Sequence, residues 1–372
     1  MEPIRILHSF TIMNRGGAET MIMNYYRALD RDKIQFDFVV HRAVRGCYDD
    51  EIERLGGRIY RLPPFNPLKI GQFKRELDRL FTEHPEYRIV HAHNCTYSMY
   101  ILRAAMQHGV PTRIAHSHLA RREIDFKTPF FGYSNLRIGE FLTHGFACSR
   151  SAAQWQFGRK NLDNTRILKN ALDLSDFAYS NESRQASRKT LAIDNQAYVI
   201  GHVGRFNPSK NHAFLLEIFA KLGIKAPQAI LMLAGDGSLR PNLEAKAIDL
   251  GIADRVRFLG VRGDIPELLQ AMDVFVFPSL FEALPVTVIE AQAAGLPCLL
   301  SDTITRECDV TGNVQFLPLS AGPEAWATEI LKRQGIGRLP DAVQRVAQAG
   351  YDVQTNAKWL EEFYLCEYRA SL

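Results

Sequence analysis

Short apolar segments alternate with amphipathic helical segments along most of this chain, and no other feature limits its possible folds so strongly. The segments "IRILHSF", "FDFVVH" and "RIVHAHN" are typical of buried strands, and the helical segment before the last of them carries Phe73, Leu77 and Leu80 on one face. Strands that alternate with helices form βαβ units and a parallel sheet. The sequence therefore predicts a doubly wound α/β fold.

The alternation stops once and then begins again. A polar segment rich in Asn, Asp and Ser follows residue 172, and the strand-like "AYVIGHVGRF" restarts the pattern. A chain of 372 residues is also too long for one typical core. We therefore predict two Rossmann-like domains, 1–172 and 197–350, with a connector over 173–196 and a final helix over 351–372. Because such sheets bind ligands at the carboxyl ends of their strands, two domains with facing strand ends would enclose a central cleft.

The sequence shows none of the usual signals for secretion or membrane insertion. No uncharged apolar run approaches the roughly 20 residues that span a bilayer, and "MEPIRILHSF" lacks the regions of a signal peptide. The six cysteines are scattered without a C-x-x-C pair, which is typical of free thiols in a reducing compartment. We therefore expect a cytoplasmic protein.

Basic residues gather in one part of the chain. Residues 103–169 contain eleven Lys or Arg against four acidic residues, whereas the net charge of the whole chain is only +4. Such a stretch attracts anions, which include phosphates, nucleic acids and acidic membrane surfaces, but it does not choose among them. Charge that only keeps the protein in solution remains an alternative.

Residues that suit phosphate binding follow the first strand of each predicted domain. Gly16 and Gly17 precede a helix, where backbone N–H groups can approach a phosphate closely, although a plain turn would explain them too. In the second domain, Arg205 and Lys210 flank a turn, and such cations suit a pyrophosphate. Two solvated surface cations are the alternative. No acidic residue ends the segment "FDFVVHR", which argues against a dinucleotide site of the dehydrogenase type.

Two carboxylates surround the start of an apolar helix in the stretch "PSLFEALPVTVIEAQAAGLP". Pro285 suits the first turn of that helix, so Glu282 is expected in the preceding loop and Glu290 within the helix. Free amides near Val286 and Thr287 can bind phosphate oxygens. The face around Glu290 is apolar, and a carboxylate there needs hydrogen-bond donors, which a polyol ligand would supply. A solvated helix residue is the alternative for Glu290.

Four histidines form two H-x-H pairs at strand ends, His91 with His93 and His116 with His118. Such pairs can bind zinc, but no nearby Asp, Glu or Cys completes a convincing ligand set. We therefore expect no metal site, with His91 and His116 as satisfied core residues and His118 as a hydrogen-bonding residue at the reacting centre. The one D-x-D motif, Asp30 to Asp32, follows a helix and is interpreted as a surface turn.

The chain resembles the family 4 retaining glycosyltransferases of GT-B fold, and most closely the bacterial capsular and exopolysaccharide enzymes. The likeness rests on "NRGGAETMIMNYYRALD", "GRFNPSKN", "AGDGSLRPNLEAKAIDLG" and the long segment from "VRFLGVRGD" to "AAGLPCL". Its most specific part is the E-x₇-E spacing of Glu282 and Glu290 after "FVFPS". The resemblance covers about residues 4–320.

The resemblance implies a nucleotide-sugar donor bound mainly by the C-terminal domain. The diphosphate would contact Arg205 and Lys210, the ribose Glu290, and the donor sugar Glu282. The resemblance also implies that the C-terminal helix packs back on the N-terminal domain. The implied catalytic residues are His118 and Glu282, and the implied donor-binding residues are Gly16, Gly17, Arg205, Lys210, Val261, Arg262, Glu282, Val286, Thr287 and Glu290, of which Val261 and Arg262 would hold the base.

Two departures from the family pattern stand out. Ala283 takes the place of the usual Gly after Glu282, and "KNALD" stands where "PNGID" is usual. Ala283 has less backbone freedom than Gly, so the pose of the donor sugar can differ from that of other members.

We therefore expect a retaining, metal-independent transferase without a cofactor. It would move a sugar, by family likeness from a UDP-sugar, to a glycan or lipid-linked acceptor in capsule or exopolysaccharide synthesis. The basic stretch suits peripheral contact with the anionic inner face of the membrane, and we expect no nucleic acid partner. A sugar-nucleotide epimerase or hydrolase of the same fold, or a non-catalytic nucleotide-binding protein, remains as an alternative function.

Overall fold

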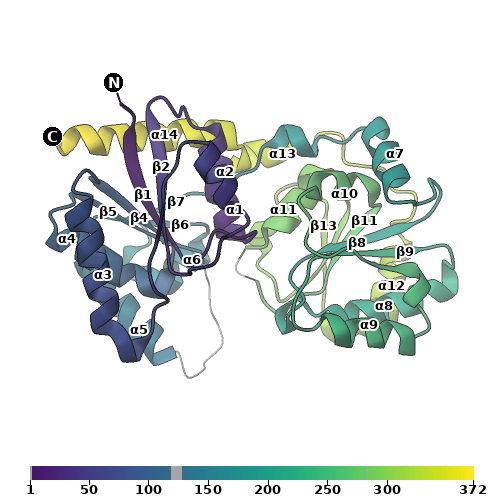
Figure 1. The fold of residues 1–372 in the computed structure, drawn as a ribbon. Coiled ribbons are helices and arrows are strands. Elements are labelled where there is room, and N and C mark those ends of the chain that lie inside the picture. Colours follow the sequence, from purple (N-terminus) through teal and green to yellow (C-terminus); the bar gives the residue numbers. More distant parts are fainter. Residues whose placement is uncertain (1, 119–127, 283) are drawn as a thin grey trace. The chain divides into compact units, whose positions relative to one another are not determined.

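The computed structural model describes residues 2–118, 128–282 and 284–372, and these form two compact units. The first unit contains Met1–Leu172 together with Tyr351–Leu372, and the second contains Asp173–Gly350. Each unit has one parallel sheet with helices on both faces (Figure 1), so the predicted doubly wound α/β fold is confirmed. Ala283 and residues 119–127, which include part of the basic stretch, lie outside the described residues.

The first unit has a seven-stranded sheet of order β3-β2-β1-β4-β5-β6-β7. Its strands are β1 (Ile4–Phe10), β2 (Ile34–Val40), β3 (Ile59–Arg61), β4 (Ile89–Ala92), β5 (Thr112–Ser117), β6 (His144–Ala147) and β7 (Thr165–Ile167). Its helices are α1 (Gly17–Ala28), α2 (Asp49–Arg54), α3 (Ile70–Glu83), α4 (Ser98–Gln107), α5 (Thr128–Arg137), α6 (Arg150–Phe157) and α14 (Val353–Ala370).

The second unit has a six-stranded sheet of order β10-β9-β8-β11-β12-β13. Its strands are β8 (Val199–Val203), β9 (Ile230–Ala234), β10 (Val256–Phe258), β11 (Val274–Phe277), β12 (Cys298–Ser301) and β13 (Val314–Leu317). Its helices are α7 (Asn181–Thr190), α8 (His212–Lys225), α9 (Arg240–Asp249), α10 (Ile265–Ala271), α11 (Val286–Ala293), α12 (Gly322–Leu331) and α13 (Ala342–Val346).

The strand order reverses once in each sheet, between β1 and β4 in the first unit and between β8 and β11 in the second. At such a switch point the loops after the two central strands diverge to opposite faces and leave a crevice at the carboxyl edge of the sheet. Each sheet therefore has one preferred ligand-binding edge. Most candidate residues of the sequence follow these central strands, His118 follows the neighbouring β5, and Val261 and Arg262 follow the edge strand β10.

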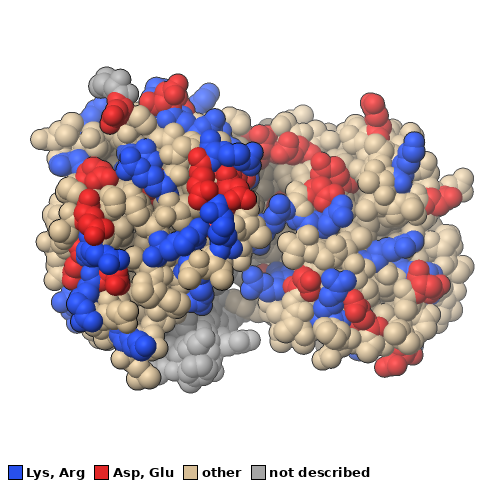
Figure 2. All heavy atoms as spheres, in the orientation of Figure 1, with Lys and Arg blue, Asp and Glu red and all other residues tan. Residues whose placement is uncertain are grey.

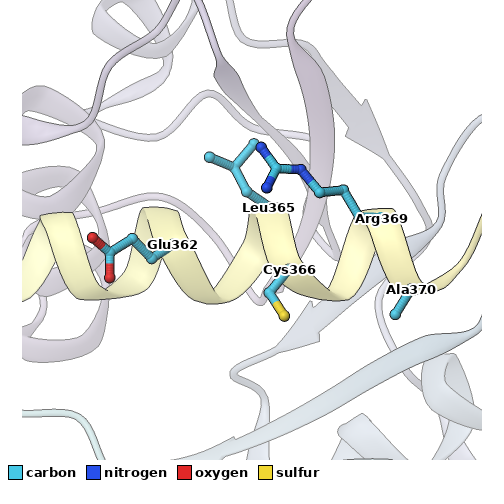
Figure 3. Close-up of a pocket in the computed structure, with 5 residues that line it drawn as sticks. All are labelled: Glu362, Leu365, Cys366, Arg369 and Ala370. Carbon is cyan, nitrogen blue, oxygen red and sulfur yellow. The ribbon is translucent and has the colours of Figure 1, made fainter.

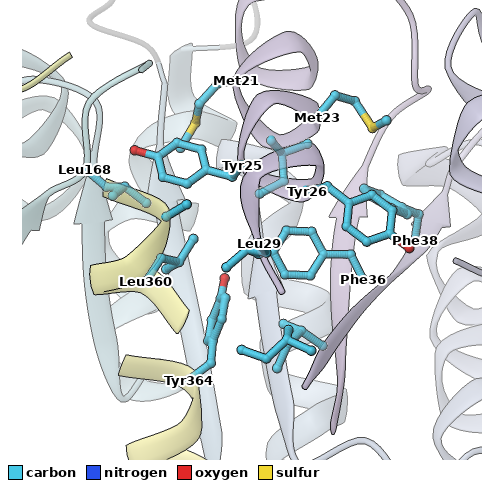
Figure 4. Packing of buried hydrophobic residues seen from close by; sticks show 14 of the residues in the cluster. Met21, Met23, Tyr25, Tyr26, Leu29, Phe36, Phe38, Leu168, Leu360 and Tyr364 are labelled. Atoms are coloured by element: carbon cyan, nitrogen blue, oxygen red, sulfur yellow. The ribbon is translucent and has the colours of Figure 1, made fainter. Parts of the chain in front are cut away.

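The last helix of the chain, α14, packs against the first unit. It begins after Asp352, whose carboxylate accepts the backbone N–H groups of Gln354 and Thr355. Leu360 and Tyr364 of this helix join the same buried cluster as Tyr25 of α1 (Figure 4). The expected connector over 173–196 belongs to the second unit, where it contains α7.

Two further expectations concern thiols and membrane insertion. None of the six cysteines forms a disulfide bond in the described residues, and four of them are buried. None of the helices in the described ranges has both the length and the apolar character needed to cross a bilayer.

Several cations of the basic stretch are bound within the first unit. Arg113 donates to the carbonyl oxygen of Phe141 at 2.7 Å, Arg137 binds Glu140, and Arg166 lies over the ring of Trp359 at 5.4 Å. On the face shown in Figure 2, basic side chains of this unit lie among acidic ones. Part of the stretch therefore stabilises the unit itself.

Candidate functional site

The loops after β8 and β11 are held against each other at the carboxyl edge of the second sheet. The backbone N–H of Leu280 donates to the carbonyl oxygen of Ser209 at 2.7 Å, and the side chain of Asn211 donates to that of Pro278 at 3.2 Å. Asn211 has a left-handed backbone (φ 55°, ψ 41°), which Asn tolerates better than most residues. These contacts bring two loops that are about 70 positions apart in the sequence to one place at the switch point.

The loop after β9 also lies at this edge, where its backbone passes so close to the loop after β8 that only glycine fits at position 235. Gly235 has φ +142°, and a Cβ there would lie 2.0 Å from the carbonyl oxygen of Gly204. A side chain at this position would push the two loops apart. Arg205, the next residue after Gly204, has an exposed side chain, so its guanidinium faces solvent at the same edge.

Lys210 and Glu282 form an ion pair between the two central loops. The Nζ atom of Lys210 lies 2.6 Å from Oε1 of Glu282, and the two side chains are only 16% and 15% exposed. The ammonium also lies 4.7 Å from the ring centre of Phe277, which is a favourable position for a cation. Asn207 accepts the backbone N–H of Lys210 and thereby fixes the turn before it. The structure therefore brings together two residues that lie 72 positions apart in the sequence.

Glu290 lies inside α11 with almost no solvent exposure. Only 9% of the residue is exposed, and burial raises the pKa of its carboxyl group to about 7. Among the described residues no hydrogen bond or ion pair with this carboxyl group is found. Because its pKa lies above the ordinary 4.5, the stability from this group is full below pH 4.5 and is lost as the pH rises through about 7. Burial therefore favours the neutral acid.

The start of α11 offers further unpaired polar groups. Pro285 is the residue directly before the helix rather than part of its first turn, so Val286 and Thr287 provide the first two helical amides. The hydroxyl groups of Thr287 and Ser279 are buried and have no partner within the described ranges. Buried polar atoms are normally hydrogen-bonded, so these groups indicate a place where a polar ligand would supply the partners.

Val261 and Arg262 lie in the loop after β10, at the edge of the same sheet. The backbone N–H of Gly235 donates to the carbonyl oxygen of Gly260 at 2.8 Å, which connects this loop to the one after β9. Val261 is 63% exposed, and Arg262 donates to Asp264 at 2.8 Å. The second unit thus places its candidate residues in loops or at a helix start on one sheet edge, except Glu290, which lies further inside α11.

In the first unit, the two glycines lie where α1 begins. Gly16 is the residue before the helix and has no side-chain cap, and the carboxylate of Glu19 folds over it, 2.3 Å from where a Cβ would lie. Gly17 is exposed. The amides at this helix start face the carboxyl edge of the first sheet, where a helix N-terminus favours an anion.

Five histidines of the first unit form two hydrogen-bonded rows across the strands. In one row, Nδ1 of His8 lies 3.1 Å from Nε2 of His93, whose Nδ1 lies 2.9 Å from Nε2 of His118. In the other, Nδ1 of His91 lies 2.6 Å from the hydroxyl of Tyr364, and its Nε2 lies 3.2 Å from Nδ1 of His116. Burial lowers the pKa of all five, so the rings are neutral. The sequence does not mark His8 as part of this group, because it is a lone histidine within β1 and has no H-x-H partner.

The histidines could also be considered as metal ligands. Two sets of three, His8 with His91 and His93, and His93 with His116 and His118, place ring nitrogens within 4.8 Å of one another. In both sets, however, nitrogens that would bind a metal face each other at hydrogen-bond distance. A proton shared between two neutral rings accounts for these distances, and the absence of a metal site stays a prediction of the sequence.

Two other features lie outside these clusters. Asp30 and Asp32 are exposed in the turn between α1 and β2, and Asp30 pairs with Lys33 at 2.9 Å. A surface depression along α14 is lined by five residues of that helix (Figure 3). No candidate residue of the sequence lines this depression, and its residues are Glu362, Leu365, Cys366, Arg369 and Ala370.

Comparisons with known families match both units. The model described as glycosyl transferases group 1 matches residues 183–332, and the model described as glycosyl transferase 4-like domain matches residues 16–168. The "Putative glycosyltransferase EpsF" of Bacillus subtilis is 38% identical over 97% of this chain and 96% of its own length. The capsular polysaccharide biosynthesis glycosyltransferase CapH of Staphylococcus aureus is 25% identical over 88% of this chain and 90% of its own.

Solved structures agree on the fold. The Anabaena protein HepE, solved in complex with UDP and glucose, aligns with a TM-score of 0.79 at 20% identity and covers 98% of this chain and 100% of its own. WaaG, a glycosyltransferase involved in lipopolysaccharide biosynthesis, aligns with a TM-score of 0.69 at 17% identity over 98% of each chain.

Proposed function

The chain belongs to the glycosyltransferases of GT-B fold, and from this premise we propose that it transfers a sugar from a UDP-sugar to a glycan or lipid-linked acceptor, with retention and without a metal ion. The process it serves is bacterial polysaccharide synthesis, as the names of its relatives indicate. The observation that carries the proposal is the cluster at the edge of the second sheet. There Lys210, Glu282 and Glu290 surround a helix start with unpaired polar groups.

The choice of UDP and of a lipid-linked acceptor is supported by the names of relatives. An Escherichia coli relative, 36% identical over 38% of this chain, is named as a UDP-Gal:alpha-D-GlcNAc-diphosphoundecaprenol alpha-1,3-galactosyltransferase. The HepE structures contain UDP, UDP with glucose, or UDP-glucose. We further propose that the basic side chains of residues 103–169 favour an anionic membrane face, where such acceptors lie.

The proposed reaction breaks the bond between the sugar C1 and the donor phosphate oxygen. The oxygen keeps the electron pair and leaves as UDP, while an acceptor hydroxyl attacks C1 from the same face and gives its proton to the departing phosphate. Negative charge therefore grows on the diphosphate, where Lys210, Arg205 and the first amides of α11 would stabilise it. These groups can supply the charge stabilisation that a metal ion provides in other transferases.

The remaining roles follow from the chemistry of each side chain. We propose that Glu282 accepts hydroxyl groups of the donor sugar, that Glu290 accepts those of the ribose, and that Val261 and Arg262 hold the base. For the first unit, the amides at Gly16 and Gly17 would bind phosphate oxygens, and His118 would hydrogen-bond the donor sugar.

Metal independence gives a direct activity test. We expect UDP release that depends on a lipid-linked sugar acceptor and continues at an unchanged rate in excess EDTA. Chromatographic detection of UDP, which needs no metal-dependent coupling enzyme, measures this rate with a panel of UDP-sugars and acceptors. Loss of activity in EDTA that a divalent ion restores would contradict the metal-independent mechanism. Equal UDP release without any acceptor would indicate a hydrolase instead.

The raised pKa of Glu290 predicts that donor binding depends on pH. Ribose hydroxyls donate to the carboxylate but not to the protonated oxygen, so binding selects the ionised form. With a pKa of about 7 for Glu290, the affinity for UDP-glucose should rise about tenfold between pH 6 and pH 8 and then level off. UDP-glucose suits this titration because, unlike UDP, it has no terminal phosphate that titrates in this range.

Calorimetry in two buffers of different ionisation enthalpy would measure both the affinity and the proton released. The control is Glu290→Gln, which keeps the shape of the side chain but does not titrate, so its affinity should be weaker and flat with pH. An equal pH dependence in both proteins would assign the titration to another group.

A further inference from the structure

His118 ends a row of three imidazoles that begins in the core of the first unit. His8 lies on β1, His93 follows β4 and His118 follows β5, so the row crosses the two strands of the switch point and the next strand. The ring of His93 is held in place by Phe10, stacked at 4.4 Å, and its backbone N–H donates to the carbonyl oxygen of Ser9. His118 is thus hydrogen-bonded to a ring, that of His93, whose own position is fixed.

Because the three rings are neutral, each carries one N–H and one lone pair. Only two arrangements satisfy both hydrogen bonds of the row. In the first, His8 donates from Nδ1 to His93, His93 donates from Nδ1 to His118, and His118 keeps its own proton on Nδ1. In the second, all three protons lie on Nε2, and the donation runs from His118 to His8.

The surroundings of His8 distinguish the two arrangements. Its Nε2 atom is buried and has no partner in the described part of the chain, and the rings of Phe36 and Phe38 lie 4.1 and 5.6 Å from the imidazole. Each arrangement leaves one ring N–H without a partner among the described residues, Nε2–H of His8 in the second and Nδ1–H of His118 in the first. His8 is fully buried against apolar rings, whereas His118 is only partly buried after the end of β5, so an unpaired N–H costs less at His118, which favours the first arrangement.

We propose that His93 is a positioning residue that holds His118 in the Nδ1–H tautomer, so that His118 presents a hydrogen-bond donor to an oxygen of the donor sugar. The hydrogen bond made by one ring nitrogen determines which nitrogen of a histidine carries the proton. In the described residues Nδ1 of His118 has no other partner. The role of the free N–H toward a sugar rests on the proposed function, whereas the tautomer of His118 does not.

The tautomer can be measured on the unmodified protein. With ¹⁵N-labelled histidine, NMR distinguishes protonated from unprotonated ring nitrogens, and His118→Ala identifies the signals of His118. We expect a protonated Nδ1 on His118 and a scalar coupling across the hydrogen bond to Nδ1 of His93. A protonated Nε2 on His118, or no coupling to His93, would overturn the proposal.

A variant pair tests the role of His93 in activity. His93→Phe keeps a ring against Phe10 but removes both nitrogens, and His91→Phe is the matched control from the same strand, because His91 belongs to the other row. We expect His93→Phe to lower kcat/KM for the donor about tenfold, as for a lost positioned hydrogen bond. His91→Phe should stay within about twofold, since it makes no bond to His118.

A double-mutant cycle separates positioning from general damage to the fold. If His93 acts through His118, then His93→Phe has no further effect on kcat/KM in a His118→Ala background. Additive losses would contradict a role through His118. If no nucleotide-sugar is turned over at all, the proposed function fails, and the NMR result alone decides whether His93 sets the tautomer.

Discussion

Replacing Lys210 with methionine is expected to lower kcat/KM for the nucleotide-sugar by a factor of about 100 to 1,000, the usual cost of removing one group that stabilises a developing charge. Methionine keeps an unbranched stem beside Phe277 but removes the ammonium that pairs with Glu282 at 2.6 Å. Most of the loss should appear in kcat, because the charge on the leaving diphosphate grows as the bond breaks. Steady-state kinetics at saturating acceptor measures both parameters.

The matched control for this variant is Lys225→Met. Lys225 ends α8 of the same unit, and its half-exposed side chain pairs with Glu324 at 3.4 Å, on the surface. Its loss removes one positive charge from the unit without touching the sheet edge, so kcat/KM should stay within about twofold. Similar losses in the two variants would mean that net charge, rather than the position of Lys210, supports the reaction.

Replacing Arg188 with methionine is expected to destabilise the second unit by about 3 to 5 kcal/mol, the typical cost of breaking a buried charge pair. Arg188 is fully buried in α7 and binds Asp273 at 2.8 Å. The same guanidinium donates to four backbone carbonyl oxygens, namely those of Ala271, Asp194, Asn195 and Ala197. Asp273 in turn accepts the backbone N–H of Val199 at the start of β8, so the variant loosens the first strand of the sheet.

Lys189→Met is the control, because Lys189 follows Arg188 on the same helix but is exposed. Its effect on the free energy of unfolding should stay below about 0.5 kcal/mol. Trp326 is fully buried in the second unit, so its fluorescence reports the unfolding of that unit in a background where Trp155 and Trp359 are replaced by Phe. If Arg188→Met lowered the free energy of unfolding by less than about 1 kcal/mol, the result would contradict a stabilising role for the contacts of Arg188.

The sequence predicts the strands well because each one is a short apolar run between helices of clear periodicity. The placement of Arg205, Lys210 and Glu282 after strands follows from the same reading, since loops after parallel strands share one edge. The sequence places Pro285 one residue too far into α11, because a proline suits several positions around a helix start. The sequence also does not show that Arg188, within the segment 173–196, binds Asp273.

The histidine rows could not be predicted from spacing alone. Alternation in a strand indicates that His91 and His93 share a face, but the bonds to His8 and His118 depend on strand order and on side-chain directions. The pairing of Lys210 with Glu282 is likewise a property of the assembled loops. The sequence identifies the side chains that lie at the carboxyl edge of each sheet. Which of these side chains are in contact depends on the folded structure.

The most direct test of the proposed donor site is calorimetric titration of the wild-type chain with UDP, GDP and ADP, alongside Lys210→Met and Lys225→Met. We expect saturable binding of UDP to one site, with affinity at least about 30-fold weaker in Lys210→Met and nearly unchanged in Lys225→Met. Binding of another nucleoside diphosphate with the same dependence on Lys210 would keep the site and change the base. No binding of any of the three, or equal binding to both variants, would contradict a donor diphosphate at this edge of the second sheet.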